Sequence, residues 1–519
     1  MKLTNTALAL AAALLMAVAP ICHAAAGPGV SWQAAAADAD IDRHFARAKA
    51  EKKPMLLYWG AKWCPPCNQL KATLFNRADF IEQSKAFVAV GIDGDAPGAQ
   101  KLGTRFKVRG YPTMILFNPS GNEITRLPGE ADAAQVMKVL QLGLSSGRPV
   151  KAVLADAMAG KKLSANEWRM LGFYSWDTDE QQLVAGADRG VTLALLAKAS
   201  EGSDSEAATR LWLKAMGEMG SGKAADPGLL PRLRAVLADA AQARGQMDVL
   251  TNDAPDLVKA FAPQAGPTRS ALVAEFDTAL KRLNQDQTLS RADRLGALLS
   301  RVELARMDVA KDELHPATIP APLLAEVREQ VQQLDREVTN AYERQAVVSG
   351  AAQLLARAGL WAESDELLKA GLARSHSAYY LMGHLGGNAK RQGRKAEALA
   401  WYKEAFNASE GPATRLQWGA TYIAALVELS PEDTARIEKT AAQLFSEAQR
   451  DPGSFHERSE ASLKRVASSL AKWNQGPDQA AAVGRLKSRL DGICSRLDGG
   501  DAQARSACTG LMKPAARKA

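Results

Sequence analysis

The pattern of hydrophobic and polar residues divides the chain into two parts, and the first part alternates between two periods. Four short apolar runs are bounded by turn residues and predict strands: 55–59, 87–92, 113–117 and 123–127. Helical spacing occurs in four other stretches: 38–52, 68–74, 98–106 and 131–144. This order is typical of a mixed α/β domain, in which helices cover a central buried sheet.

The second part of the chain lacks strand signals. After Pro149, alanine, leucine, glutamine and charged residues dominate, in the pattern of amphipathic helices. The Ser, Gly and Pro residues of 145–149 read as a linker. We therefore expect an α/β domain over residues 27–147 and an all-helical domain over residues 148–519.

An internal repeat lies within the helical part. Gly359 and Gly393 are 34 residues apart, a period that indicates helix pairs joined by glycine turns. The residues with the best match to a tetratricopeptide helix pair are Leu385, Gly386, Ala398, Tyr402 and Ala405. Looser matches occur around Gly359 and in the W-x2-L-G stretch at 168–172. We expect a helical array that resembles tetratricopeptide repeats at about 350–410; the alternative is an irregular helical domain.

Residues 1–26 have the pattern of a signal peptide. Lys2 precedes an apolar run, Ala7–Ala19, which is shorter than the ~18 residues of a membrane span, and small residues follow it. Lipid attachment at Cys22 and an uncleaved anchor are the alternatives, although Ile21 is larger than the residue that normally precedes a lipidated cysteine. We expect no integral membrane segment after signal removal, and a periplasmic or secreted protein.

Composition narrows the classes of function. The chain has 519 residues, 47% hydrophobic and 24% charged, with a net charge of +8, which is ordinary for a globular protein. Most of the basic excess lies before residue 151, so the nearly neutral helical part argues against nucleic-acid binding. The six histidines are scattered, so we expect no metal site. Five cysteines are too few for a disulfide-dense scaffold.

One pair of cysteines has the spacing of a redox site. The segment Trp63–Cys67 reads WCPPC and lies between a predicted strand and a predicted helix. At a helix N-terminus, free N–H groups and the helix dipole would favour the thiolate of Cys64, and Cys67 would lie one turn away. A zinc knuckle and a structural bridge are the alternatives, but two further ligands for zinc are missing nearby.

This region resembles the thioredoxin superfamily. The resemblance rests on Tyr58–Cys67 (YWGAKWCPPC) and on Gly110–Thr113 (GYPT), and Pro54–Phe80 is similar to the C-terminal domain of DsbD-type exported proteins. It implies a thioredoxin fold, a cis-proline at Pro112 and a substrate chain that pairs with the backbone beside it. The substrate-binding residues that it implies are Trp63, Tyr111, Pro112 and Thr113.

The departures from the family pattern concern proton transfer. Tyr58 stands where these proteins usually have a buried aspartate, and Lys71 stands at the position of an acidic residue after the second cysteine. A water molecule or a tyrosine hydroxyl would then have to accept and donate the proton of the Cys67 thiol. Lys62 and Lys71 would favour the thiolate of Cys64 if they pointed inward, but we expect both to be solvated.

The predicted reaction is thiol–disulfide exchange. Cys64 would attack a substrate disulfide, and Cys67 would resolve the mixed disulfide. We expect a reductase without a cofactor other than the Cys64–Cys67 disulfide. Its partners would be protein disulfides, a thiol–disulfide electron donor or acceptor and a protein bound by the helical part. The alternative is a helical scaffold or chaperone-like binding protein with a vestigial redox module.

A second cysteine pair lies near the C-terminus. Cys494 and Cys508 flank the turn Asp498–Asp501. Two helices joined there would bring the thiols together, so we expect a structural disulfide. The alternative is an electron shuttle to Cys64 and Cys67.

Overall fold

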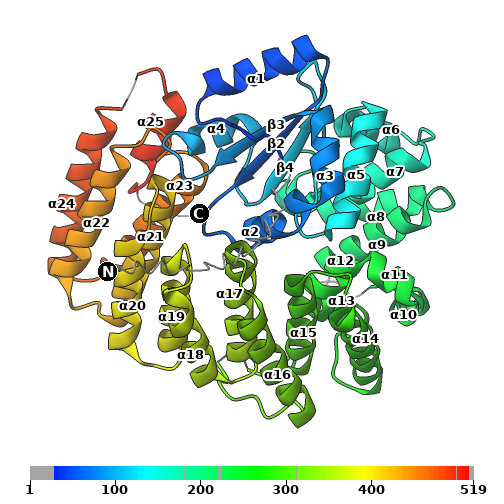
Figure 1. Cartoon of the computed structure of the whole chain (residues 1–519). Helices are drawn as coiled ribbons and strands as arrows, with labels where there is room; N and C mark the ends of the chain where they lie inside the picture. Colours follow the sequence, from blue (N-terminus) through cyan, green and yellow to red (C-terminus); the bar gives the residue numbers. More distant parts are fainter. Residues whose placement is uncertain (1–28, 180–181, 220–224, 311, 498, 514–519) are drawn as a thin grey trace, which may run out of the picture.

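The computed structural model describes residues 29–513, apart from 180–181, 220–224, 311 and 498 (Figure 1). The predicted signal peptide at 1–26 lies outside the described residues. Within the described ranges, every helix is too short or too polar to cross a membrane.

A five-stranded mixed sheet forms the centre of the N-terminal part. Its strands are β1 (Gln33–Ala34), β2 (Met55–Gly60), β3 (Val88–Asp93), β4 (Thr113–Phe117) and β5 (Glu123–Leu127). The spatial order is β1-β3-β2-β4-β5; β1, β3 and β2 run parallel, and β4 and β5 are antiparallel to their neighbours. The predicted α/β fold is confirmed. Strand β1 was not predicted, because its two residues are too few to show a period.

Helices cover both faces of this sheet. They are α1 (Asp38–Glu51), α2 (Pro65–Ala72), α3 (Ala78–Gln83), α4 (Ala99–Phe106) and α5 (Ala133–Ser146). Successive residues of β2 point to opposite faces, so Trp59 packs with α1 and α4, whereas Tyr58 packs with α2, α3 and α5. The predicted linker at 145–149 is wrong in its first two residues, because α5 continues to Ser146 and ends only at Gly147, whose φ is 65°.

The rest of the described chain is helical, as predicted. Its first half contains α6 (Val150–Met158), α7 (Ala165–Gly172), α8 (Arg189–Ser200), α9 (Ser205–Met219), α10 (Leu230–Ala238), α11 (Ala240–Gly245), α12 (Met247–Asn252), α13 (Ala254–Phe261), α14 (Pro267–Gln285) and α15 (Arg291–Ala305). Its second half contains α16 (Ala321–Glu337), α17 (Ala341–Arg357), α18 (Trp361–Leu372), α19 (Ala378–Arg391), α20 (Lys395–Ala408), α21 (Pro412–Leu429), α22 (Thr434–Ala448), α23 (Glu457–Trp473), α24 (Pro477–Cys494) and α25 (Ala502–Gly510).

The 34-residue repeat corresponds to two helical hairpins. Gly359 turns α17 into α18, and Gly393 turns α19 into α20, with φ of 81° and 72°, a region that favours glycine. In α19, a Cβ at Gly386 would come within 2.9 Å of the Tyr402 ring, so the absence of a side chain lets α19 and α20 pack closely. The weaker stretch at 168–172 lies in α7, whose Gly172 packs against Ala207 of α9.

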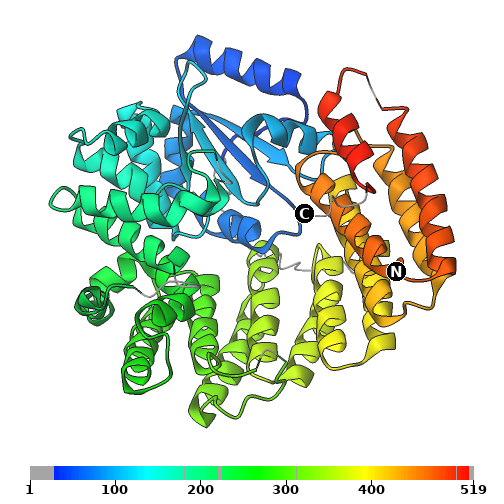
Figure 2. The ribbon, with the colours of Figure 1, turned by 180° about the vertical axis from the view of Figure 1, so that it is seen from behind.

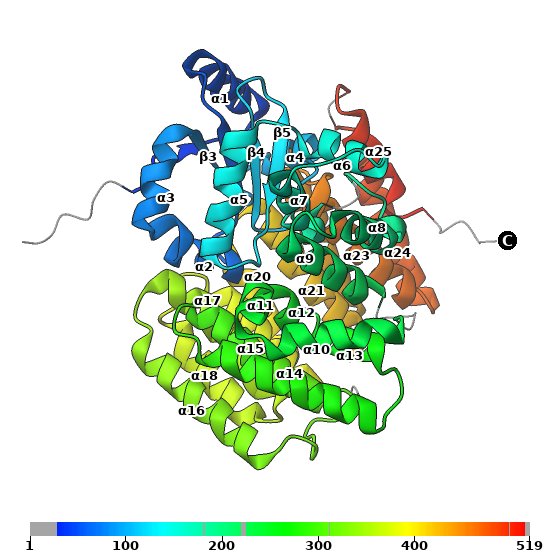
Figure 3. The ribbon, with the colours of Figure 1, turned by 90° about the vertical axis from the view of Figure 1, so that its right-hand side faces the viewer.

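The helical region curves around the α/β domain as an arc (Figure 1, and from behind in Figure 2). Near its start, α7 packs against α5; near its end, α23 packs against α4. Between these ends, α17 packs against α2, the helix that carries the cysteine pair. Figure 3 shows the same arrangement from the side, with α2 directly above α17. The arc therefore contacts the α/β domain at both ends and at α2.

Candidate functional site around Cys64 and Cys67

Cys64 and Cys67 form a disulfide at the start of α2. Their Cα atoms are 5.3 Å apart. Cys64 is the N-cap, and its Sγ accepts a hydrogen bond from the backbone N–H of Cys67 at 3.2 Å. Pro65 and Pro66 occupy the first two helical positions, where a missing N–H costs no helical hydrogen bond. The sulfur of Cys64 thus lies at the positive end of the helix dipole.

The sheet brings the other predicted site residues to the same edge. Trp59 of β2 pairs with Thr113 of β4, so the segments that follow β2 and precede β4 are neighbours. The rings of Trp63 and Tyr111 are 6.5 Å apart, and the Tyr111–Pro112 peptide bond is cis, as the resemblance implies. The segment Tyr111–Thr113 therefore lies at the same edge of the sheet as Trp63, and substrate binding by Trp63, Tyr111, Pro112 and Thr113 stays a prediction.

Side chains of the helical region surround Trp63. Its ring stacks on Tyr380 at 5.6 Å and meets Trp418 edge-on at 5.2 Å. The guanidinium of Arg458 lies 5.3 Å from the Trp63 ring, within cation–π range. The indole N–H donates to Thr414 at 2.7 Å. The tryptophan of the motif is therefore held mainly by residues of α19, α21 and α23.

The backbone of the motif is also bound by the helical region. Gln345 donates to the carbonyl oxygen of Trp63 at 3.1 Å, and His376 donates to that of Lys62 at 3.0 Å. As a result, Cys64 is only 2% exposed and Cys67 is fully buried. The helical region covers the face on which the resemblance places the substrate. The sequence analysis missed this cover, because these partners are 282 to 314 positions away along the chain.

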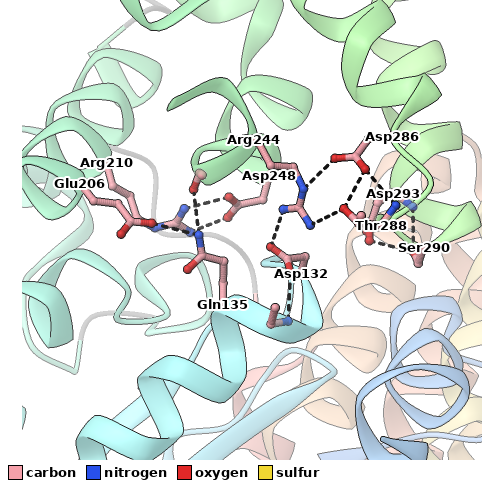
Figure 4. Close-up of polar contacts among 12 residues, drawn as sticks. Asp132, Gln135, Glu206, Arg210, Arg244, Asp248, Asp286, Thr288, Ser290 and Asp293 are labelled. Carbon is pink, nitrogen blue, oxygen red and sulfur yellow. Dashed lines mark hydrogen bonds and ion pairs between the residues drawn. The ribbon is translucent and has the colours of Figure 1, made fainter. Parts of the chain in front are cut away.

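Polar contacts hold the arc on the α5 side of the site (Figure 4). Arg244 joins Asp132, the N-cap of α5, to Asp286 at 2.9 Å each. Beside the motif, Gln69 of α2 donates to Asp293 at 2.7 Å. These contacts fix α2 and α5 against α11 and α15.

A second set of contacts holds the arc on the α4 side. His456 is buried and hydrogen-bonded to Thr104 of α4 and to Asp501, at 3.1 Å each. Arg109, close to the cis-proline segment, pairs with Glu457 at 2.8 Å. Both ends of the cover are therefore anchored by ion pairs or hydrogen bonds.

Two basic residues near the motif differ in their surroundings. Lys62 is exposed, as expected, and pairs with Glu410 at 3.3 Å. Lys71 is half-buried rather than fully solvated: partial burial lowers its pKa, and its Nζ lies 5.4 Å from the Tyr342 ring. Lys71 and Tyr58 line a cavity of about 570 Å³ beside α2. The Tyr58 hydroxyl is buried and has no hydrogen-bond partner among the described residues, and burial raises its pKa.

One carboxyl group touches the motif directly. Asp95 accepts a hydrogen bond from the indole N–H of Trp63 at 3.0 Å. Burial raises the pKa of Asp95 to about 6, although hydrogen bonds from Thr414 and Trp63 oppose this. Asp95 therefore changes charge at mildly acidic pH, at the boundary between the α/β domain and the helical region.

The second cysteine pair forms a disulfide between α24 and α25. Cys494 and Cys508 have Cα atoms 5.6 Å apart, and both are buried. Over the described parts of the chain, no cluster of histidine, cysteine or acidic side chains has the arrangement needed to bind a metal ion.

Comparisons with known proteins agree with the fold of the first part. Residues 41–143 match the family model of the thioredoxin-like domain. The thiol:disulfide interchange protein DsbD 2 of Pseudomonas aeruginosa is 33% identical over 99 residues, 18% of this chain and 17% of that protein. DsbD of Klebsiella pneumoniae is 31% identical over 136 residues, 24% of this chain and 22% of that protein. The chain thus spans less than a quarter of these relatives.

Among solved structures, a DsbH oxidoreductase is 20% identical, with a TM-score of 0.20, and the match covers 26% of this chain and 96% of that one. The family match and the sheet together establish that a thioredoxin-like domain precedes the large helical region.

Proposed function

We propose that this protein is a thiol–disulfide oxidoreductase that reduces disulfides with Cys64 and Cys67. The observation that carries the proposal is the Cys64–Cys67 disulfide at the N-terminus of α2, beside Tyr111 and Pro112, in a thioredoxin-like domain. The relatives named for thiol:disulfide interchange support the same chemistry.

The reaction starts from the reduced pair. The Cys64 thiolate attacks one sulfur of the substrate disulfide, that S–S bond breaks, and the first substrate thiol leaves with a proton from solvent. Cys67 then loses its proton and attacks the Sγ of Cys64, which releases the second thiol. Two electrons pass to the substrate, and the Cys64–Cys67 disulfide remains. A thiol–disulfide electron donor must then reduce it; no other cofactor is needed.

The direction of electron flow is tested by the reduction potential. We expect a midpoint below about −200 mV when the purified protein is equilibrated with glutathione buffers, in the range of reducing thioredoxin-like pairs. A midpoint near about −120 mV would show an oxidase instead. The Cys494→Ser/Cys508→Ser variant is the control, because its only remaining pair in the mature chain is Cys64 and Cys67.

We also propose an oxidising compartment, either the periplasm or the outside of the cell. The support is the Cys494–Cys508 disulfide, because structural disulfides persist where thiols are not kept reduced. Non-reducing mass spectrometry of protein purified from a cell fraction tests this. A free thiol at both positions would contradict it.

A binding role for the helical region is the second candidate, and the cover over Cys64 favours it. A scaffold with a vestigial disulfide would keep Cys64 closed at all times. The two candidates differ in the rate at which the reduced protein reduces a small disulfide. If the redox pair is functional, this rate exceeds the rate with free dithiothreitol; if the disulfide is vestigial, it does not.

A further inference from the structure

A cavity of about 460 Å³ lies among helices α17–α21. This volume is within the usual range of small-molecule sites, roughly 300–1,000 Å³. Tyr380 and Trp418 form part of its wall. The same two rings contact Trp63, at 5.6 and 5.2 Å. The cavity is therefore separated from the tryptophan of the redox motif by a single layer of aromatic side chains.

The charged side chains that line this cavity are all basic. Arg357 and Arg391 belong to its wall, and the wall includes no aspartate or glutamate among the described residues. Arg357 is paired with Glu303, whereas Arg391 forms no ion pair within the described part of the chain. His384, also in the wall, is neutral at pH 7, because burial lowers its pKa to about 4.

Further cations crowd around the cavity. Burial, and then repulsion by Arg357 and Arg391, lowers the pKa of Arg306, although attraction by Glu303 and Glu313 opposes this. Arg458, which lies over Trp63, donates a hydrogen bond to Gln417 of the cavity wall. The basic side chains of the wall itself thus favour an anion in the cavity.

Access to the cysteines also restricts the substrate. With Cys64 2% exposed, a folded protein would have to displace the arc, which is anchored at both ends. A small molecule in the cavity would already contact Tyr380 and Trp418, the two rings that pack on Trp63. The cover over Cys64 therefore favours small substrates, and the basic cavity favours negatively charged ones.

We propose that the cavity binds the acidic end of a low-molecular-weight disulfide, which is the substrate class of the Cys64–Cys67 pair. This inference rests on the proposed function and specifies its substrate. The electron balance is that of the exchange described above: the pair is oxidised to a disulfide, and the small disulfide is reduced to two thiols.

The test uses three disulfides of similar length and different charge: dithiodipropionate, a dianion; hydroxyethyl disulfide, which is neutral; and cystamine, a dication. The reduced full-length protein is mixed with each in turn, and the rate is divided by the rate of the same disulfide with dithiothreitol. We expect the dianion to react fastest and the dication slowest, with about a tenfold difference at low ionic strength that decreases with salt.

Two variants locate the source of this preference. Arg391→Gln should remove most of the difference between dianion and dication, whereas Arg336→Gln, at an exposed position of α16 outside the cavity, should leave it unchanged. Equal normalised rates for the three disulfides, or equal effects of the two variants, would overturn the inference. Failure of the proposed function gives a different result, because then even hydroxyethyl disulfide would not oxidise the pair.

Discussion

The two disulfides of this protein have the same bond and almost the same Cα separation, 5.3 and 5.6 Å, but opposite helix environments. Cys64 is the N-cap of α2, where the helix dipole stabilises a thiolate. Cys494 is the last residue of α24, and Cys508 lies in the last turn of α25, where the dipole disfavours negative charge. Since all four of these cysteines are buried, position on a helix, rather than burial, distinguishes the two pairs, and it supports the proposal that the first pair is reactive and the second structural.

The largest expected effect comes from the first pair. Cys64→Ser removes the nucleophile, so we expect the normalised rate of hydroxyethyl disulfide reduction to fall at least about a thousandfold. The measurement is the loss of substrate disulfide under excess protein. Cys494→Ser/Cys508→Ser is the control, and a similar loss there would remove the distinction and support an electron shuttle.

The second pair should affect stability instead. Cys494→Ser/Cys508→Ser opens a loop of about 15 residues, which we expect to lower the free energy of unfolding by about 3 kcal/mol. Denaturant unfolding of the α24–α25 region measures this, with the reduction potential of the first pair unchanged. Unchanged stability would mean that the bond is not a structural one.

Asp95 should make the cover of the first pair dependent on pH. Its pKa is about 6 in the folded protein against an ordinary value of 3.8, so the native state binds the proton more tightly than the unfolded state. Stability contributed by the protonated form is therefore lost as the pH rises from about 4 to about 6, by about 3 kcal/mol.

Asp95→Asn removes this titration and should flatten the stability profile over that interval. The measurement is denaturant unfolding of variant and wild type at pH 4, 5, 6 and 7. Asp478→Asn, at an exposed position of α24, is the matched control. Parallel profiles for Asp95→Asn and the wild type would contradict the prediction.

The smallest expected effect is on the accessibility of Cys64. Tyr380→Ala removes the ring stacked on Trp63 and should accelerate alkylation of reduced Cys64 by iodoacetamide several-fold. Tyr342→Ala is the control, because Tyr342 contacts Lys71 and His376 rather than Trp63. If both variants accelerated alkylation equally, general loosening of the arc would explain the effect.

Local patterns in the sequence predicted most of the fold. The strands at 55–59 and 113–117 carry continuous apolar runs, and the glycine spacing at 359 and 393 predicted two hairpins. Short elements such as β1 and α3 were missed, because two and six residues show too little periodicity. The half-burial of Lys71 was not predicted, because helix α17, which contacts it through Tyr342, comes from a distant part of the chain.

The sequence by itself predicted the proposed chemistry of the first pair, because a CxxC motif after a strand and at a helix start favours one reactive thiol and one nearby partner. Only the tertiary structure decided which molecules can reach the Cys64–Cys67 pair. Trp63 meets Thr414 across 351 positions, and contacts of this range are made by irregularly spaced aromatic and polar side chains that leave no period in the sequence. The cover over Cys64 exists only where the helical region packs on α2, and the basic cavity exists only where helices α17 to α21 pack together.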